Sequence, residues 1–475
     1  MQKLIARKKE IRELERLYQS SSPEFVVVYG RRRIGKTFLI NQCFDGRFAF
    51  TYVGSRRESS KIQLRRFARQ LKEYGGMKKT PSLSNWDDAF DELRKLLANI
   101  PGGSKKVVFF DEMPWIDTPR GGFVSALEYF WNSWASKRED IMFIACGSAT
   151  SWMVSKLVKN TGGLYNRITA HVYLRPFTLS ECEEFLDSKG CNWDRYTILQ
   201  CFMVFGGVPY YLSLIDERES LVQNVDRLCF NRNGALRNEF DQLFNALFDK
   251  ADKYTEVAVA LSERREGLVR NEIIEKTHIS GGTLTKILDN LERCDFISRY
   301  SKYKSTSRNV LYRLSDPYLL FYFKFICGND TKDEKFWSNN FMSGAVRAWQ
   351  GFSFELVCLS HLNQLKKALG VNGIATKSCS WRKIGDDNED GAQIDLLIDR
   401  ADRVINVCEM KFSQIPFNIT KEYEWQLRKK MTIFTQYSHT TKALSLTMVT
   451  TFGVAKGKHY GIVNNEVVMD QLFDD

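Results

Sequence analysis

The chain has 475 residues, of which 43% are hydrophobic and 27% charged, values typical of a folded globular protein of two to four domains. Its net charge of +12 favours an acidic partner, most simply nucleic acid. No apolar run approaches the roughly 20 residues of a membrane span, and the five His are isolated. The sequence therefore argues against a membrane protein and against a His/Cys zinc site.

The opening of the chain indicates a protein of a reducing compartment. Residues 4–17, LIARKKEIRELERL, are charged throughout and do not form a secretory signal, and residues 3–18 have the apolar spacing of an amphipathic helix. The eleven Cys are scattered without a CxxC pair. We therefore expect free thiols and a cytoplasmic location.

Residues 26–40, VVVYGRRRIGKTFLI, predict a strand, a loop and the start of a helix. The loop fits the phosphate-binding pattern GxxxxGK[ST] and consists of Gly30, Arg31, Arg32, Arg33, Ile34, Gly35, Lys36 and Thr37. Glycines permit the backbone N–H groups to turn toward a phosphate chain at the positive end of the helix. We expect Lys36 to reach the β- and γ-phosphates and Thr37 to bind Mg²⁺.

A second strand, predicted in residues 105–117, KKVVFFDEMPWID, ends in two acids. At the end of a strand that follows a phosphate loop, Asp111 would hold the Mg²⁺ through water, and Glu112 would polarise the attacking water. These residues complete a predicted site for nucleotide hydrolysis.

A further buried strand, residues 141–148, ends in Ser148. Its hydroxyl either contacts the γ-phosphate or the water, or caps the following segment; the sequence does not decide between the two. Alternating strands and helices predict a parallel three-layer α/β sheet with the nucleotide at its carboxyl edge. ATP is favoured over GTP because no NKxD element for guanine is present.

The segment after that strand carries Arg167 and Arg175 and leads into a helical region. Thr178 or Ser180 is expected to cap the first helix, with Glu183 and Ser180 forming a capping box. Residues 181–249 then look mostly helical, with a break at Gly206-Gly207-Val208-Pro209. They predict a helical lid.

Together, VVVYGRRRIGKT, FFDEMPW, the Gly-Ser after the fourth strand, LRPFTLSE and GGVPYYL resemble the archaeal-type ATPases, P-loop proteins near the AAA+ and STAND classes. The family's opening GRExE element reads Ala6-Arg7-Lys8-Lys9-Glu10 here, without its Gly. The resemblance implies an ATP- and Mg²⁺-dependent ATPase. It also implies that Arg167 or Arg175 completes the ATPase site, from a neighbouring subunit of a homo-oligomer.

Residues 250–328 predict two helices followed by two short strands around a basic loop, the pattern of a winged helix-turn-helix, a module that the same family carries. Lys302, Lys304 and Arg308 would lie on the wing. The exposed start of the second helix would carry Thr283, Thr285 and Lys286. Such modules bind DNA or mediate protein contacts only, and DNA is the expectation here.

Residues 345–475 begin with an apolar helix carrying Glu355 and continue to two apolar strands around the turn 399–402. Asp395 lies on the first strand. Glu409 and Lys411, one residue apart on the second, share a face. Two carboxylates and an ammonium suit Mg²⁺-dependent phosphodiester cleavage: the acids hold the metal and the ammonium stabilises developing charge.

This arrangement is similar to the PD-(D/E)xK nuclease core, and archaeal-type ATPases often end in such a domain. The resemblance makes Glu355 the helix acid of that fold and Asp395 and Glu409 metal ligands. Two residues before Asp395, where the family often has Glu, this chain has Gln393.

The sequence thus predicts an α/β protein of four parts: a three-layer P-loop ATPase core (1–180), a helical lid (181–249), a winged helix-turn-helix (250–328) and a C-terminal α/β restriction-endonuclease-like domain (345–475). The expected function is ATP-regulated cleavage of DNA. One alternative is an ATP-controlled DNA- or protein-binding switch with an inactive C-terminal domain, and another is a signalling or defence ATPase that assembles on a trigger.

Overall fold

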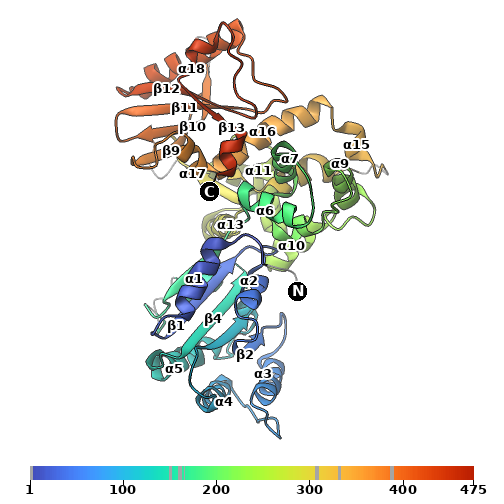
Figure 1. Cartoon of the computed structure of the whole chain (residues 1–475), viewed down its shortest axis with the longest axis vertical. Coiled ribbons are helices and arrows are strands. Elements are labelled where there is room, and N and C mark those ends of the chain that lie inside the picture. Colours follow the sequence, from blue (N-terminus) through green and yellow to red (C-terminus); the bar gives the residue numbers. More distant parts are fainter. Residues whose placement is uncertain are drawn as a thin grey trace. The chain divides into compact units, whose positions relative to one another are not determined.

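The computed structural model describes residues 4–148, 152–158, 163–164, 166–304, 310–329, 333–385 and 390–474. The chain forms two compact units, Met1–Arg175 and Pro176–Asp475, and each is considered by itself (Figure 1). Within the described ranges, every helix is too short or too polar to cross a membrane.

A five-stranded parallel sheet organises the first unit, in the order β2-β3-β4-β1-β5. Its strands are β1 (Glu24–Gly30), β2 (Phe48–Val53), β3 (Lys106–Asp111), β4 (Ile141–Ser148) and β5 (Ala170–Leu174). β1, β3 and β4 confirm strands expected from the sequence. β5 was not expected as a strand.

Helices cover both faces of this sheet, as the predicted three layers require. They are α1 (Lys8–Tyr18), α2 (Lys36–Cys43), α3 (Ser60–Tyr74), α4 (Trp86–Asn99) and α5 (Phe123–Ser133), with the short 3-10 helices η1 (Met113–Trp115) and η2 (Ala135–Lys137) and the π-helix η3 (Met153–Val158). Val26 and Val28 of β1 pack toward α1 and α2, whereas Phe25 and Val27 pack toward the aromatic core under α3, α4 and α5. Alternation along the strand produces the two cores.

The second unit opens with helices: α6 (Leu179–Ser188), α7 (Arg195–Phe205), α8 (Pro209–Ser213), α9 (Leu221–Val225), η4 (Asp226–Phe230) and α10 (Glu239–Leu247). Thr178 and Glu181 form the capping box of α6, so the expected Ser180–Glu183 box is wrong. Glu183 instead pairs with Arg195, 2.7 Å away. The break after α7 requires glycine, because a Cβ at Gly207 would lie 2.0 Å from the Phe177 carbonyl oxygen.

The next segment packs helices against a three-stranded antiparallel sheet, order β6-β8-β7. Its elements are α11 (Ala251–Ser262), β6 (Leu268–Val269), α12 (Arg270–Thr277), α13 (Gly281–Arg293), β7 (Ile297–Tyr300) and β8 (Leu311–Leu314), followed by α14 (Pro317–Phe321) and η5 (Tyr322–Ile326). The two expected helices are α12 and α13, and the two expected strands are β7 and β8. Arg308 lies outside the described residues.

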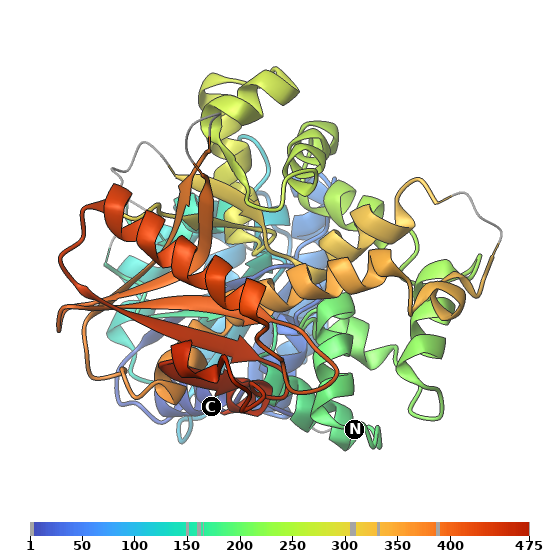
Figure 2. The ribbon, with the colours of Figure 1, turned by 90° about the horizontal axis from the view of Figure 1, so that it is seen from above.

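The end of the chain forms a mixed sheet, order β13-β12-β11-β10-β9, in which β9, β10 and β11 are antiparallel and β11, β12 and β13 are parallel. Its strands are β9 (Thr376–Lys383), β10 (Ala392–Arg400), β11 (Val404–Lys411), β12 (Ala443–Thr450) and β13 (Asn465–Val468). The helices here are α15 (Phe336–Asn340), α16 (Gly344–Ser360), α17 (Leu362–Ala368) and α18 (Lys421–Ser438), with η6 (Tyr460–Ile462) and η7 (Met469–Phe473). α18 lies across one face of the sheet, where Leu427 and Phe434 join its core (Figure 2).

Candidate functional site

The predicted phosphate loop runs from the end of β1 into the first turn of α2. Gly30 cannot be larger, because a Cβ there would lie 2.3 Å from the Leu174 carbonyl oxygen. Gly35, with φ of 82°, caps the amino end of α2 in the left-handed conformation that favours glycine. The loop therefore turns at its two glycines, as the sequence predicts.

Side chains of the loop divide into buried and accessible ones. Arg31 and Ile34 are buried, and Ile34 packs in the core between the sheet and α1 and α2, whereas Arg32 and Arg33 are half-buried. The Lys36 ammonium donates hydrogen bonds to the carbonyl oxygens of Gly30 (3.3 Å) and Arg31 (2.8 Å). It is thus held inside the turn that was predicted to surround the phosphates.

Thr37 and Asp111 meet although they lie on different elements. β4 separates β1 from β3 in the sheet, and the two strands end at the same edge. Thr37 Oγ1 donates a 2.8 Å hydrogen bond to Asp111 Oδ2, and the Glu112 backbone N–H donates one of 2.8 Å to Asp111 Oδ1. The hydroxyl and carboxylate predicted to serve one Mg²⁺ therefore lie side by side.

Glu112 has a strained backbone, with φ of 45° and ψ of 42° in the left-handed region. A non-glycine residue pays on the order of 1–3 kcal/mol for this conformation, and such residues cluster at functional sites. Ser148 ends β4 directly opposite Gly30 in the strand register and is buried. Ser148 therefore flanks the phosphate loop, and Glu112 directly follows Asp111, the partner of Thr37.

Arg7 contributes to the loop in a way that the sequence left open. It is buried, and its Nη2 donates a 3.3 Å hydrogen bond to the Ile34 carbonyl oxygen. Ala6 and Arg7 both have positive φ, 61° and 59°. The family's GRExE element, here without its Gly, was the available signal.

Arg167 and Arg175 are both exposed. They lie at opposite ends of β5, Arg167 before its amino end and Arg175 after its carboxyl end. Arg175 follows Leu174, which is paired in register with Gly30, so it lies at the edge of the phosphate loop. Its guanidinium is 5.7 Å from the centre of the Tyr173 ring. Arg167 lies two residues before Thr169, whose backbone N–H donates a hydrogen bond to the Phe25 carbonyl oxygen near the start of β1. Arg167 is therefore at the end of the sheet opposite the phosphate loop.

In the second unit, Glu355 of α16, Asp395 of β10 and Glu409 and Lys411 of β11 lie in one electrostatic neighbourhood. β10 and β11 are paired from Leu396 opposite Cys408, and continuing that register by one residue brings Asp395 level with Glu409. Burial and the charge of Asp395 raise the pKa of Glu355 to about 7, with a smaller contribution from Glu409. The structure thus brings the predicted acids together.

Glu409 is also bound by two residues of α18 that the sequence did not single out. Its Oε1 accepts from the Tyr423 hydroxyl (2.7 Å) and lies 3.1 Å from the Lys411 ammonium; its Oε2 accepts from Lys430 (2.6 Å). Burial raises the pKa of Glu409, but the two ammonium groups outweigh it and lower the pKa to about 2. The carboxylate is therefore ionised and charge-compensated by side chains.

The other two acids also have partners. Asp395 Oδ1 accepts a 2.8 Å hydrogen bond from Gln393 Nε2, at the position where the family often has Glu. Glu355 Oε2 lies 3.6 Å from Nη2 of Arg313, a buried residue of β8. Across the described ranges, no three acidic, His or Cys side chains are arranged as metal ligands. The acids are gathered, but not in a ready-made coordination geometry.

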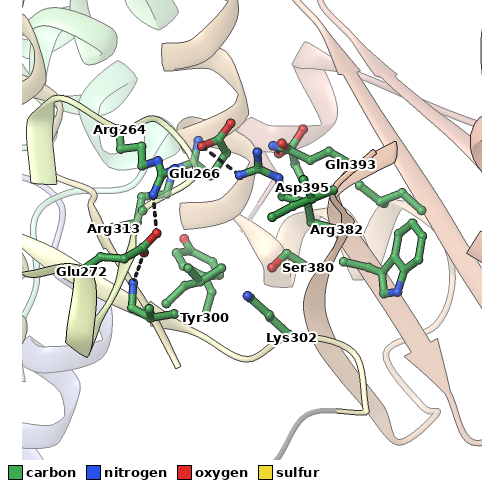
Figure 3. A pocket seen from close by; sticks show the side chains of 16 residues that line it. Arg264, Glu266, Glu272, Tyr300, Lys302, Arg313, Ser380, Arg382, Gln393 and Asp395 are labelled. Carbon is green, nitrogen blue, oxygen red and sulfur yellow. Dashed lines mark hydrogen bonds and ion pairs between the residues drawn. The ribbon is translucent and has the colours of Figure 1, made fainter. Parts of the chain in front are cut away.

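A pocket of about 190 Å³ opens beside Asp395 between the three-stranded sheet and β9 and β10. Figure 3 shows Arg264, paired with Glu272, facing Arg382, Gln393 and Asp395 across it. Arg382 pairs with Glu266 at 3.3 Å, and Lys302 also lines the pocket. The 250–328 segment therefore contributes cations next to the C-terminal acids.

Two of the basic residues expected on the wing, Lys302 and Lys304, contact the C-terminal part of the chain, and Lys302 forms a bridge with Ser380 of β9. Tyr303 N–H donates to the Ser380 carbonyl oxygen of β9 (2.8 Å), and the Tyr303 ring packs 5.3 Å from Phe434 of α18. The Lys304 ammonium donates to the carbonyl oxygens of Ser438 (3.0 Å) and His439 (3.3 Å) at the carboxyl end of α18. Lys304 is thus engaged within the chain, because this cation favours the negative end of the helix.

The start of α13 is exposed, as expected. Thr283, Thr285 and Lys286 are all on the surface. Thr285 Oγ1 accepts a 3.0 Å hydrogen bond from Arg270, whose guanidinium also donates to the Gly281 carbonyl oxygen (2.7 Å). This surface carries two accessible cations next to a helix amino end.

Residues 4–215 match a protein family described as an ATPase domain predominantly from Archaea. This match covers both halves of the nucleotide site described above. The amino-terminal part of the chain is therefore a P-loop ATPase domain with a parallel α/β core, and the protein is an ATPase.

An uncharacterised protein of Methanocaldococcus jannaschii is 24% identical over 440 residues, covering 90% of this chain and 91% of that protein. Among solved structures, a Walker-type ATPase of Pyrococcus abyssi has a TM-score of 0.47 and 17% identity, covering 67% of this chain and 96% of that one. The ORC2 protein of Aeropyrum pernix has a TM-score of 0.41 and 13% identity, covering 68% and 94%.

Proposed function

We propose that this ATPase acts on DNA and that its C-terminal part is a Mg²⁺-dependent nuclease regulated by the nucleotide state. The observation that carries the proposal is the gathering of Glu355, Asp395, Glu409 and Lys411 at the end of two paired strands. In the same proposal the chain comprises an ATPase core (1–180), a lid (181–249), a winged helix-turn-helix (250–328) and a nuclease-like domain (345–475).

In the ATPase, the backbone N–H groups of residues 30–37 and the Lys36 ammonium bind the phosphates of ATP. Thr37 and Asp111, 2.8 Å apart, would hold Mg²⁺, which neutralises developing charge on the phosphates. Glu112 orients and polarises the attacking water. Ser148, level with Gly30, contacts the γ-phosphate or that water.

An arginine from a neighbouring subunit completes the site. Arg175 is the better candidate if the subunits meet near the phosphate loop, because it directly follows Leu174, the residue of β5 that pairs with Gly30. Arg167 serves only an interface formed at the opposite end of the sheet. Either requires a homo-oligomer.

DNA binds at the exposed start of α13, where Arg270 and Lys286 meet backbone phosphates. The net charge of +12 supports an electrostatic contribution to this binding. Because Lys304 binds the end of α18, the wing contributes less to DNA binding than its basic composition suggests.

The donor set of the C-terminal acids fits a divalent cation, since carboxylate oxygens are the ligands that Mg²⁺ prefers. Asp395, Glu409 and Glu355 would hold the metal, which polarises the phosphodiester and activates water when bound. Lys411, on the same strand face as Glu409, stabilises charge that develops on the phosphate. Lys430 would have to release Glu409 for a metal to bind there.

The alternative is a nucleotide-controlled switch whose C-terminal domain recognises DNA or protein without cleaving. One observation favours it: Lys411, Lys430 and Arg313 already compensate the carboxylates of Glu409 and Glu355 without a metal. A cation is therefore not electrostatically required at this site.

Calorimetric titration with Mg²⁺ or Mn²⁺ in the presence of DNA, followed by plasmid nicking, separates the two functions. The nuclease proposal expects metal uptake and nicking that Asp395→Ala and Glu409→Gln abolish together. Lys411→Ala should retain metal binding and lose nicking. Intact plasmid and no metal uptake by the wild-type protein would establish the switch instead.

A further inference from the structure

The outward face of α18 forms an open groove with the end of β9. The groove has a volume of about 540 Å³, and its lining includes Lys383, Asp390, Trp425, Arg428, Lys429 and Tyr437. Trp425 is 60% exposed, which is unusual for so large an apolar side chain. Three cations and one acid surround two aromatic rings, so the groove is basic and aromatic at once.

Each ring in the groove has a cation on its face. The Lys429 ammonium is 4.7 Å from the centre of the Trp425 ring, and the Lys383 ammonium is 3.8 Å from that of Tyr437. The cations also form ion pairs near the surface, Arg428 with Glu424 (2.6 Å) and Lys429 with Asp390 (2.5 Å). Exposed pairs of this kind are worth only about 0–1 kcal/mol, so phosphate groups can replace them.

The opposite face of the same part of α18 contacts Glu409, one of the C-terminal acids. Tyr423 and Lys430 both donate to Glu409, while Trp425 and Lys429, their near neighbours in sequence, face the groove. A helix with its side chains is about 10–12 Å across. A ligand in the groove would therefore be separated from Glu409 by the width of one helix.

We propose that this groove binds single-stranded nucleic acid, with an unpaired base stacked on Trp425 and flanking phosphates on Arg428 and Lys429. Every base has a face that can stack on an aromatic ring, and a positively charged groove follows the backbone. A duplex keeps its bases stacked inside and cannot use Trp425 in this way. The proposal deepens the proposed function, on which it rests, by giving the substrate class as a single strand.

The test is fluorescence anisotropy of labelled oligothymidylate and oligouridylate with the full chain in EDTA, so that binding is measured without cleavage. Trp425→Ala should weaken binding about 5- to 150-fold, the range expected for one stacked base. The double change Arg428→Ala/Lys429→Ala should weaken it and lower the slope of log affinity against log salt by about 1.4, because each of two single-strand phosphate contacts contributes about 0.7. Ile415→Ala is the matched control, since Ile415 is 72% exposed in the same part of the chain but does not line the groove.

A labelled blunt-ended duplex of two complementary strands is the second probe, and its affinity should be unchanged by Trp425→Ala. Single-strand affinity that is unchanged in Trp425→Ala, equally reduced in Ile415→Ala, or absent in the wild-type protein would overturn the proposal. Because the assay needs no cleavage, a chain that binds the oligonucleotide through Trp425 yet never nicks plasmid supports the groove and refutes only the nuclease.

Discussion

Single residues set the electrostatics of the C-terminal acids. Glu409 and Glu355 belong to the same cluster but deviate in opposite directions: two lysines lower the pKa of Glu409 to about 2, whereas burial and Asp395 raise that of Glu355 to about 7. Glu409 is therefore charged at every physiological pH, and Glu355 changes its charge close to neutrality.

The raised pKa of Glu355 predicts how the free energy of unfolding depends on pH. Its folded-state pKa lies above the ordinary 4.5, so protonation favours the folded state, and stability should fall as pH rises through the window from 4.5 to about 7. Each unit of pKa shift corresponds to about 1.4 kcal/mol, which bounds the loss at about 3 kcal/mol. Glu355→Gln should remove this dependence, measured as the thermal midpoint in EDTA at about pH 5 and about pH 8. Glu275→Gln, a change at an exposed carboxylate, is the control, and an identical pH profile in wild type and Glu355→Gln would contradict the assignment.

The ATP site gives a prediction that separates binding from turnover. Lys36→Ala should lose ATP binding, because the ammonium held in the turn of the loop is gone. Glu112→Gln should bind ATP yet hydrolyse it at least about a hundredfold more slowly, since an amide cannot polarise water as a carboxylate does. Nucleotide affinity and steady-state phosphate release measure the two effects. Undiminished turnover in Glu112→Gln would remove Glu112 from its role.

At the scale of elements, the hairpin of β7 and β8 is joined to the C-terminal sheet. The residues after β7 pair with β9, and Lys304 binds the carboxyl end of α18. In the proposed function, the exposed start of α13 is therefore the surface assigned to duplex DNA.

The two lysines should therefore differ when each is replaced. Lys286→Ala should lower the slope of log affinity for duplex DNA against log salt by about one, because one phosphate contact is lost. Lys304→Ala should leave that slope unchanged and accelerate amide hydrogen exchange at the carboxyl end of α18. Each variant is the control for the other. A reduced slope in Lys304→Ala with normal exchange in α18 would return the wing to a direct role in DNA binding.

The arrangement of the predicted ATP site could be anticipated from the sequence because its parts are short continuous segments. The loop occupies consecutive residues, and Asp111, with Glu112 directly after it, ends a strand whose parallel neighbours end at the same side of the sheet. The C-terminal partners could not be anticipated in this way. Lys430 and Tyr423 reach Glu409 from a helix that crosses the sheet, and Arg313 reaches Glu355 from another sheet, so only tertiary packing brings them together.

At the scale of the whole molecule, an arginine supplied by a neighbouring subunit would make ATP hydrolysis depend on oligomer formation. Arg175→Ala should reduce turnover on the order of 10³-fold. Mixing the inactive Arg175→Ala and Lys36→Ala chains should restore activity, because the second supplies its arginine to the intact loop of the first. Repeating the experiment with Arg167→Ala in place of Arg175→Ala identifies which of the two arginines lies at the subunit interface. No recovery in either mixture, with activity per molecule constant on dilution, would exclude an arginine acting between subunits.

In the proposed function, nucleotide bound in the first unit controls DNA chemistry in the second. The most direct measurement is the rate of Mg²⁺-dependent nicking of supercoiled plasmid with and without ATP, in wild type, Lys36→Ala and Asp395→Ala. We predict nicking by the wild-type protein that changes with ATP, nicking by Lys36→Ala that does not respond to ATP, and none by Asp395→Ala. Equal nicking by wild type and Asp395→Ala, or the same response to ATP in wild type and Lys36→Ala, would contradict this proposal.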